Sequence, residues 1–256
     1  MNIFKSKIIK TKLSIIIPVF NNLSGLQKCV ESIKQQTFKN YEVWIIDGGS
    51  SIETQNYLGS LEKPFYYQSR VDKGIYDAMN KGIVLSKGEY LHFLGSDDEL
   101  FNENTLATVF AEESSTENTL IAGKVIYEGN KSAFIYNTKK KVKDVYWSKF
   151  MWVRNGLHHQ STFYKREIFD TIKYDLKYPV LADYWLNLYL FKNDFTCKIL
   201  DLPIAKCSSD GVSKSGDWTI YQEEINLKID LSNKFFKPLF YIIAKTKYLF
   251  RKQLND

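Results

Sequence analysis

Gly88-Glu-Tyr-Leu-His-Phe-Leu-Gly95-Ser96-Asp97-Asp98-Glu99 is the stretch that decides the fold of this 256-residue chain. Its apolar run, residues 90–94, is bounded by glycines and is typical of a strand buried on both faces. The run ends in a cluster of acids, and in an open α/β sheet ligands bind outside the carboxyl ends of the strands.

Neighbouring carboxylates such as Asp97 and Asp98 repel each other unless a cation lies between them. Carboxylate oxygens suit Mg²⁺ or Mn²⁺, which bind substrate phosphates and keep several waters. The stretch therefore predicts a metal and phosphate site. The alternative is that both aspartates cap a helix that starts near Leu100.

The first hundred residues alternate strands with helices. Strands are predicted at residues 13–19, 41–46 and 65–68, with helices between them. This alternation predicts a parallel sheet with right-handed crossovers. Asn21, Asp47 and Asp97 each follow the carboxyl end of a strand. Three polar clusters at one sheet edge are harder to explain as helix caps than one, so we expect a shared ligand crevice.

Composition and charge narrow the class of protein. The net charge is +6, and 44% of residues are hydrophobic, which is ordinary for a globular chain. Three cysteines form no paired framework, which favours a reducing compartment. The N-terminus lacks a signal-peptide pattern, and no stretch of about 18 apolar residues predicts a spanning helix. We therefore expect a cytoplasmic protein. Its basic residues gather in a loop at 139–143 and in the tail, which does not favour a nucleic-acid binder.

The second half is less regular. Residues 119–127 and 157–164 are predicted as strands, and the second of these carries His158, His159 and Gln160. Neighbours on a strand point to opposite faces, which argues against a metal site made of the two histidines. A helix is predicted to begin at Asp183, and residues 223–252 are predicted to be mostly helical with a break at Pro238.

Residues 234–252 mix aromatic residues with lysines and are too short an apolar stretch to span a bilayer. A basic, aromatic amphipathic helix can lie in an anionic membrane surface. The alternative is that this segment packs on its own domain or on a partner chain. The sequence leaves open both a peripheral location on the inner face of the cell membrane and a homo-oligomer.

Four motifs in order give a family resemblance: Ser14-Ile-Ile-Ile-Pro-Val-Phe-Asn21, Asp47-Gly-Gly-Ser50, Asp72-Lys-Gly-Ile-Tyr-Asp-Ala-Met-Asn80 and Gly95-Ser-Asp-Asp98. Over residues 12–215 the chain resembles family 2 glycosyltransferases of the GT-A fold, particularly bacterial enzymes of colanic acid or capsule synthesis. The resemblance implies an α/β fold with a Rossmann-like, mostly parallel central sheet flanked by helices. A glycosyltransferase domain is expected at 1–220, with a nucleotide-sugar half at 12–100 and an acceptor half at 101–220. A helical, basic and aromatic extension follows at 221–256.

The resemblance also implies a donor site. The residues expected to bind the donor nucleotide are Pro18, Phe20, Asn21, Asp47, Asp72, Lys73, Ser96 and Asp97. Asp47 would accept a hydrogen bond from the base, commonly uracil, and Asp72 and Lys73 would lie near the ribose and phosphates. Asp97 matches the last acid of the family's metal-binding Asp-x-Asp, with Asp98 as a second ligand for Mg²⁺ or Mn²⁺. The first acid of that motif is Gly95 here, which leaves fewer protein ligands for the metal.

On the acceptor side, the resemblance implies that Asp183 is the general base, although the glutamate that often precedes it is Ala182 here. A helix-capping role is the alternative for Asp183. His159 or Gln160 would line the cleft, with packing as the alternative, and residues 209–213 resemble a segment that closes over the donor.

The resemblance therefore implies a metal-dependent, inverting glycosyltransferase. It would move a sugar from a nucleotide donor, expected to be UDP-linked, to a saccharide or a polyprenyl-diphosphate-linked acceptor in surface polysaccharide synthesis. A catalytically decayed nucleotide-sugar-binding or scaffold protein is one alternative. A nucleotidyltransferase is another, but it would need a glycine-rich, basic loop after the first strand, where Pro18-Val-Phe-Asn21 stands.

Overall fold

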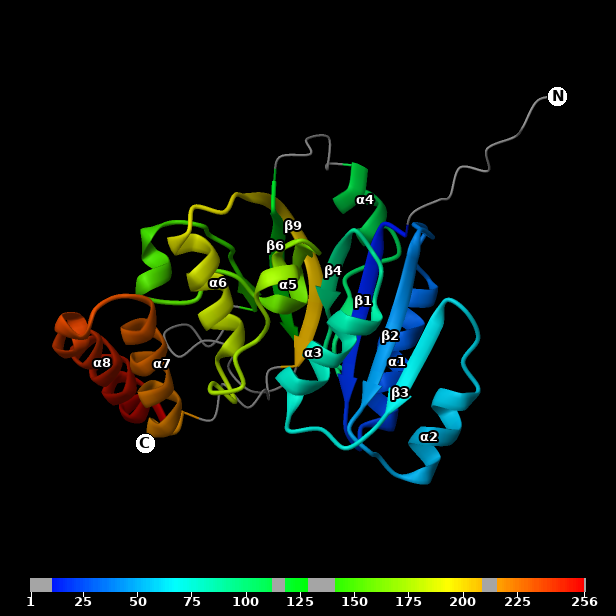
Figure 1. The fold of residues 1–256 in the computed structure, drawn as a ribbon, viewed down its shortest axis with the longest axis horizontal. Coiled ribbons are helices and arrows are strands. Elements are labelled where there is room, and N and C mark those ends of the chain that lie inside the picture. The colour runs from blue at the N-terminus through cyan, green and yellow to red at the C-terminus, as the bar shows by residue number, and fades with distance from the viewer. Residues whose placement is uncertain (1–10, 112–117, 129–140, 209–215, 256) are drawn as a thin grey trace.

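A central mixed sheet organises the computed structural model, which describes residues 11–111, 118–128, 141–208 and 216–255 (Figure 1). Within these residues nine strands form one sheet in the order β3-β2-β1-β4-β8-β6-β9-β5, with β7 paired to β6. The strands are β1 Leu13–Val19, β2 Tyr41–Asp47, β3 Phe65–Ser69, β4 Tyr90–Phe93, β5 Glu99–Leu100, β6 Leu120–Glu128, β7 Val142–Lys143, β8 Thr162–Lys165 and β9 Cys197–Ser208. The helices are α1 Leu23–Lys34, α2 Ile52–Gly59, α3 Ile75–Leu85, α4 Thr105–Ala111, α5 Ile168–Thr171, α6 Ala182–Lys192, α7 Trp218–Leu231 and α8 Lys237–Asn255. Three short 3-10 helices lie at η1 Lys149–Trp152, η2 His159–Ser161 and η4 Lys234–Phe236.

The first four strands confirm the predicted parallel half. β1 pairs in parallel with both β2 and β4, and β2 pairs in parallel with β3. The polar segments that follow these strands therefore meet at one sheet edge. β8 joins antiparallel to β4, and β6 joins antiparallel to β8, so the sheet is mixed beyond β4.

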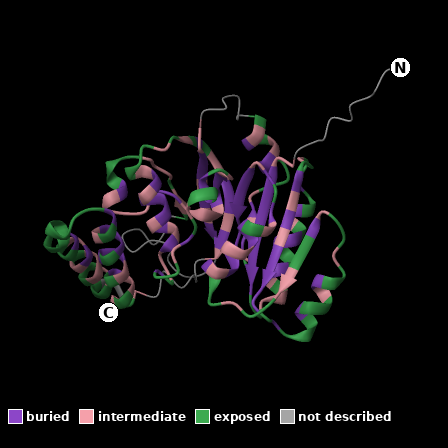
Figure 2. Cartoon of the chain, viewed as in Figure 1, coloured by how far each residue is buried: buried purple, intermediate pink, exposed green. Residues whose placement is uncertain are grey.

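Alternation along β1 divides the core into two layers. Ile15 and Ile17 belong to the cluster with α1, α2 and α4, whereas Ile16 belongs to the cluster with α3, α5 and α6. All four residues of β4 are buried, as expected for a strand covered on both faces. Figure 2 shows the buried strands between helices whose outer sides are exposed.

The alternative in which Asp97 and Asp98 cap a helix that starts near Leu100 is wrong. Glu99 and Leu100 form β5, which pairs with Lys206 and Ala205 of β9. The next helix, α4, starts only at Thr105. Asp97 and Asp98 therefore cap no helix, and the capping alternative for this acid cluster is removed.

Two further boundaries correct the sequence prediction. The strand expected over residues 157–164 begins only at Thr162, because His159–Ser161 forms the 3-10 helix η2. The break expected at Pro238 lies earlier, between α7 and η4, and Pro238 is the second residue of α8. A proline fits the first turn of a helix because the N–H groups there have no partner within the helix.

Helices α7 and α8 lie side by side at the end of the molecule opposite α2 (Figure 1). Their contact is a small separate core of Tyr221, Ile225, Phe240 and Ala244. Among the described helices, none is long and apolar enough to cross a membrane. The segment at 209–213 and most of the basic run at 139–143 lie outside the described residues.

Candidate active site

Three loops at the carboxyl ends of β1, β2 and β4 are joined by hydrogen bonds. The Asn21 N–H donates to Ser50 Oγ at 2.7 Å, and the Ser51 N–H donates to Asn21 Oδ1 at 3.0 Å. The Asn22 side-chain amide donates to Ser96 Oγ at 3.2 Å and also caps α1. Asn21 has a φ of 50°, a left-handed conformation that asparagine tolerates better than most residues. The predicted donor residues Asn21 and Ser96 therefore lie in connected loops at one edge of the sheet.

Asp47 holds the turn after β2. Its carboxylate is fully buried and accepts from the Ser50 N–H, with distances of 3.1 and 3.2 Å to its two oxygens. The Ser69 hydroxyl at the end of β3 also donates to it. In this structure Asp47 builds the loop that presents Ser50, and a contact with a donor base stays a prediction.

Phe20, Gly48 and Asp72 meet beside this turn. A Cβ at Gly48 would lie 2.7 Å from Asp72 Oδ2 and 3.3 Å from Phe20 Cδ2, so glycine permits this close approach. The Phe20 side chain is 64% exposed. Pro18 is buried within β1, and Lys73 is exposed at the start of the α3 segment. Asp72 and Phe20 thus lie beside the turn after β2, and Lys73 is the next residue after Asp72.

The two acids after β4 have different surroundings. Asp97 is exposed, whereas Asp98 is buried and accepts from Gln160 Nε2 at 2.9 Å. Burial, and secondly the charge of Asp97, raise the pKa of Asp98 above its ordinary value. A Cβ at Gly95 would lie 2.3 Å from Asp98 Oδ2, so the Asp98 carboxylate occupies the space that a side chain at position 95 would need.

The donor set at these acids fits a divalent cation that takes most of its ligands from elsewhere. In the described part of the chain no three acids, histidines or cysteines are arranged to hold a metal ion, so Asp97 and Asp98 make no complete protein cage. Mg²⁺ and related ions commonly bind one or two carboxylates together with substrate phosphates and water. Exposed Asp97 is the better placed of the two to reach such an ion.

Asp183 lies at the centre of a second polar cluster. Its Oδ1 accepts from the Tyr184 N–H at 2.7 Å and from the Tyr76 hydroxyl at 3.2 Å. Its Oδ2 lies 3.4 Å from both Asn155 Nδ2 and His159 Nδ1. The N-cap of α6 is Leu181, so the capping alternative for Asp183 is wrong.

Opposing effects set the ionisation of Asp183. Burial favours the neutral carboxyl, but the hydrogen bond and charge of His159, with Lys143 and the Tyr184 N–H, outweigh it. The pKa of Asp183 is therefore lowered from its ordinary value, and the group is a carboxylate at neutral pH.

Two consecutive residues link the two acidic centres. His159 faces Asp183 and Gln160 faces Asp98. Because these residues lie in η2, the expected alternation of a strand does not apply, and the His158 and His159 rings stack with centroids 5.5 Å apart. Both predicted cleft residues are thus part of the polar network, and neither is simple core packing.

Sequence reasoning missed two members of the Asp183 cluster. Tyr76 lies at the helical spacing of a core residue, yet its hydroxyl donates to both Asp183 and the Val180 carbonyl. Asn155 belongs to none of the sequence motifs, and its contact with Asp183 depends on the irregular segment before η2. Asn80, by contrast, pairs with the backbone of Tyr174 in both directions and is structural.

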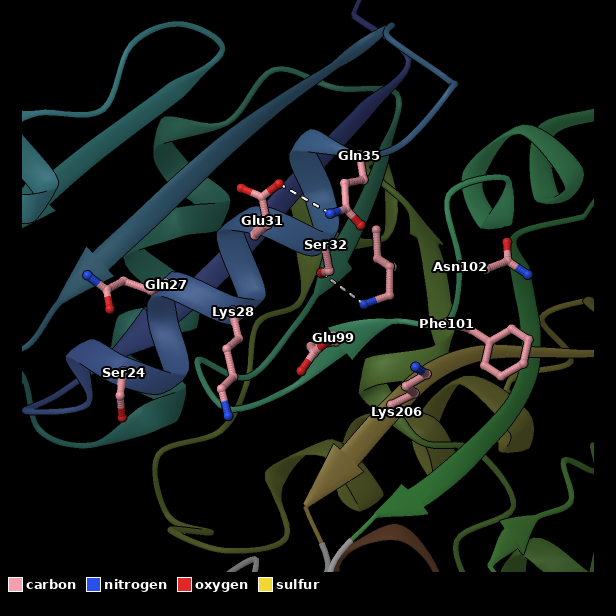
Figure 3. A pocket seen from close by; sticks show the side chains of 11 residues that line it. Ser24, Gln27, Lys28, Glu31, Ser32, Gln35, Glu99, Phe101, Asn102 and Lys206 are labelled. Carbon is pink, nitrogen blue, oxygen red and sulfur yellow. Dashed lines mark hydrogen bonds between the residues drawn. The ribbon is translucent and has the colours of Figure 1, made fainter.

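A hollow lies apart from these clusters, between α1 and β5 (Figure 3). The charged residues along it are Lys28, Glu31, Glu99 and Lys206. None of the predicted site residues lines it, and its charges of opposite sign balance. The hollow is therefore not part of the candidate site.

Comparisons with known proteins all identify glycosyltransferases. A family model described as "Glycosyl transferase family 2" matches residues 14–174. A "PGL/p-HBAD biosynthesis glycosyltransferase" of Mycobacterium bovis is 36% identical over 186 residues, or 70% of each chain. A "GalNAc(5)-diNAcBac-PP-undecaprenol beta-1,3-glucosyltransferase" of Campylobacter jejuni is 27% identical over 195 residues, or 73% of this chain and 62% of that protein.

Two solved structures show the same fold at low sequence identity. S. aureus TarS in complex with UDP superposes with a TM-score of 0.63 at 13% identity, covering 95% of this chain and 90% of that chain. The mannosyltransferase PcManGT from Pyrobaculum calidifontis, in complex with GDP-Man and Mn²⁺, gives a TM-score of 0.66 at 15% identity. That likeness covers 96% of this chain and 73% of that chain. The architecture is thus that of GT-A glycosyltransferases.

Proposed function

The chain belongs to glycosyltransferase family 2, and from this premise we propose that it transfers a sugar with inversion from a UDP-linked donor. The proposed acceptor is a saccharide or a polyprenyl-diphosphate-linked saccharide of a bacterial surface polysaccharide. The undecaprenol-linked compound named for the Campylobacter jejuni relative supports a lipid-linked acceptor. The UDP named for the complex of TarS supports the donor class.

The observation that carries this proposal is the link between the two acidic centres. η2 places His159 against Asp183 and Gln160 against Asp98, so a donor at the Asp97–Asp98 loop and an acceptor at Asp183 would share one cleft. We assign residues 12–100 to donor binding and 101–220 to the acceptor half of a domain spanning 1–220. Residues 221–256 form the extension.

The donor residues have proposed tasks that match their positions. The Asn21 and Ser96 loops, with Phe20 and Asp72 beside the turn after β2, would hold the nucleotide. Asp97, and secondly Asp98, would hold Mg²⁺ or Mn²⁺, which would supply positive charge to a diphosphate. Lys73, next to Asp72, would add to that charge.

Asp183 would provide the base. An acceptor hydroxyl attacks the anomeric carbon as the bond between that carbon and the diphosphate oxygen breaks, and the hydroxyl proton passes to the Asp183 carboxylate. A single displacement inverts the configuration, so an α-linked donor gives a β linkage. Tyr76, Asn155 and His159 would orient the carboxylate, whose lowered pKa keeps it ionised at neutral pH.

Calorimetric titration with UDP, GDP and dTDP, each with and without Mn²⁺, tests the donor site. We expect one nucleotide to bind with Mn²⁺ and to lose affinity about tenfold or more with chelator or in Asp97→Ala. Asp170→Ala, at an exposed position on α5, is the matched control.

Two outcomes would contradict this assignment. If no nucleotide binds with or without Mn²⁺, the assignment of the donor site is wrong. A catalytically decayed scaffold protein would then be the better hypothesis. If binding is equally tight without metal, the fold assignment stands but the role of Asp97 does not. Release of free nucleotide from the matching nucleotide sugar then separates an enzyme from a scaffold that only binds.

A further inference from the structure

Helix α8 has apolar residues on two sides, and the protein covers only one of them. Phe240 and Ala244 pack against α7, with exposures of 5% and 1%. On the other side Leu239, Ile242 and Leu249 are 51%, 62% and 48% exposed. Figure 2 shows the exposed residues along this helix. Soluble proteins rarely expose several large apolar side chains next to one another, so such a surface indicates a binding partner.

The exposed residues form one continuous side. Leu239, Ile242 and Leu249 are three and seven residues apart, the spacing that places side chains on the same side of a helix. Phe250, which is 57% exposed, lies beside Leu249, and only the uncharged Thr246 falls between Ile242 and Leu249 on this side. We call this set, Leu239, Ile242, Leu249 and Phe250, the outer apolar face.

The 3-10 helix before α8 extends this surface. Phe235 and Phe236 of η4 are 83% and 45% exposed, and they stand directly before the first turn of α8. A large apolar area therefore lies open at one end of the molecule, the end formed by α7 and α8 (Figure 1).

The charged residues of the segment that carries the outer apolar face are all positive. Residues 232–253 contain no aspartate or glutamate, and they carry lysines at 234, 237, 245 and 252. Lys247, on the inner side, pairs with the buried Glu224 of α7 and contacts the Val153 carbonyl. Two further cations of α8 also face α7, since Arg251 hydrogen-bonds Tyr221 and Lys245 Nζ lies over the Trp218 ring at 4.9 Å. The remaining lysines, at 234, 237 and 252, are exposed in a segment that has no acid.

We propose that residues 234–253 dock the protein on an anionic phospholipid bilayer, with α8 lying in the plane of the surface. The outer apolar face would enter the boundary between headgroups and acyl chains, and the lysines would contact anionic headgroups. A second copy of this chain is a poorer occupant, because a symmetric contact would bring the lysines of both copies together. This proposal does not rest on the donor or the reaction, because the surface contains none of the proposed catalytic residues.

Vesicle co-sedimentation of the full chain tests the proposal. We expect binding to vesicles of phosphatidylcholine mixed with phosphatidylglycerol, weaker binding to phosphatidylcholine alone, and a loss of binding as salt is raised. The double variant Ile242→Glu/Leu249→Glu should bind the anionic vesicles about tenfold less or weaker still. Val84→Glu, at a 67% exposed apolar position on α3, is the matched control and should bind like the wild type.

A second variant keeps the test independent of the apolar substitutions. Lys234→Gln/Lys237→Gln/Lys252→Gln removes three exposed cations, keeps the outer apolar face and should lose the preference for anionic vesicles. The proposal is wrong if the wild type does not sediment with anionic vesicles, or if Val84→Glu weakens binding as much as the double variant. It is also wrong if light scattering shows a stable dimer that Ile242→Glu/Leu249→Glu dissociates, since a second copy would then cover the face.

Discussion

The donor-side loops and the Asp183 cluster hold their polar groups in different ways. On the donor side, the backbone N–H groups of Asn21 and Ser51 donate to a side chain of the neighbouring loop, and the Ser50 N–H donates to Asp47 of its own turn. Around Asp183, most donors are side chains from separate elements, including the Tyr76 hydroxyl and the His159 ring. A substitution among the loops should therefore change the shape of the backbone, whereas one at Asp183 should change the chemistry and leave the backbone in place.

Asp183→Asn gives the largest expected effect and tests the chemical side of this difference. The amide keeps an oxygen for the Tyr184 N–H and the Tyr76 hydroxyl but cannot take a proton from an acceptor. We expect kcat to fall about 10²- to 10⁴-fold, the usual contribution of a general base. The measurements are steady-state transfer rates together with calorimetric titration of the nucleotide.

The nucleotide affinity of Asp183→Asn should stay at the wild-type value, because the side-chain partners of Asp183 are Tyr76, Asn155 and His159, which lie outside the loops after β1, β2 and β4. Asp170→Asn, on the exposed side of α5, is the control for both measurements. A variant that loses nucleotide affinity together with rate would show that Asp183 supports the loops after all. A variant with full activity would place the base elsewhere.

The same difference explains which features could be predicted from the sequence. The donor half follows from periodicity: buried runs such as β1 and β4 alternate with one-faced helices, and parallel pairing brings Asn21, Asp47 and Asp97 to one edge. The parallel pairing of the first strands and the helices on both sheet faces follow from this pattern, and the structure confirms them, whereas the strand order was not predicted.

The Asp183 cluster depends on contacts that periodicity does not encode. Tyr76 and Asp183 are 107 positions apart, and Asn155 and His159 lie in irregular segments. Tyr76 also satisfies the spacing of a core residue, so its hydroxyl contact had no separate signal. The short strand β5 was missed for a similar reason, because two residues are too few to show alternation.

His92 lies on β4, between the two regions. Its protonation gives the second-largest expected effect, a loss of folding stability at acidic pH. It is fully buried, stacks on Phe163 and has Nδ1 3.2 Å from the Thr162 carbonyl. Burial, the main cause, lowers the pKa of His92 from 6.5 to about 4. Between these values the unfolded chain binds the proton and the folded chain does not. Stability is therefore lost as the pH falls from 6.5 to about 4, by roughly 3 kcal/mol from this residue.

Chemical unfolding at a series of pH values measures this contribution, with His92→Phe as the comparison. Phenylalanine keeps a ring against Phe163 and cannot be protonated, so its free energy of unfolding should depend less steeply on pH over that interval. Other groups, including Asp98, whose raised pKa acts in the opposite direction, remain in both proteins and cancel in the difference. Equal slopes for the two proteins would show that His92 is not held neutral by burial.

Asp47→Ala gives the smallest expected effect and tests the structural side of the difference. It leaves the Ser50 N–H without its buried acceptor, which typically costs about 1–3 kcal/mol of folding free energy. Because Ser50 Oγ accepts from Asn21, the loop after β1 should shift as well, so nucleotide affinity should fall. Thermal unfolding of the free protein and calorimetric titration measure the two losses separately.

Ser69→Ala is the matched control for Asp47→Ala, because it removes one donor and leaves the carboxylate on the Ser50 N–H. It should lose less of both quantities. If Asp47 instead reads the donor base directly, Asp47→Ala would lower nucleotide affinity without lowering the stability of the free protein. That result would make Asp47 resemble Asp183 in acting through its own chemistry, and the contrast between the two regions would not hold.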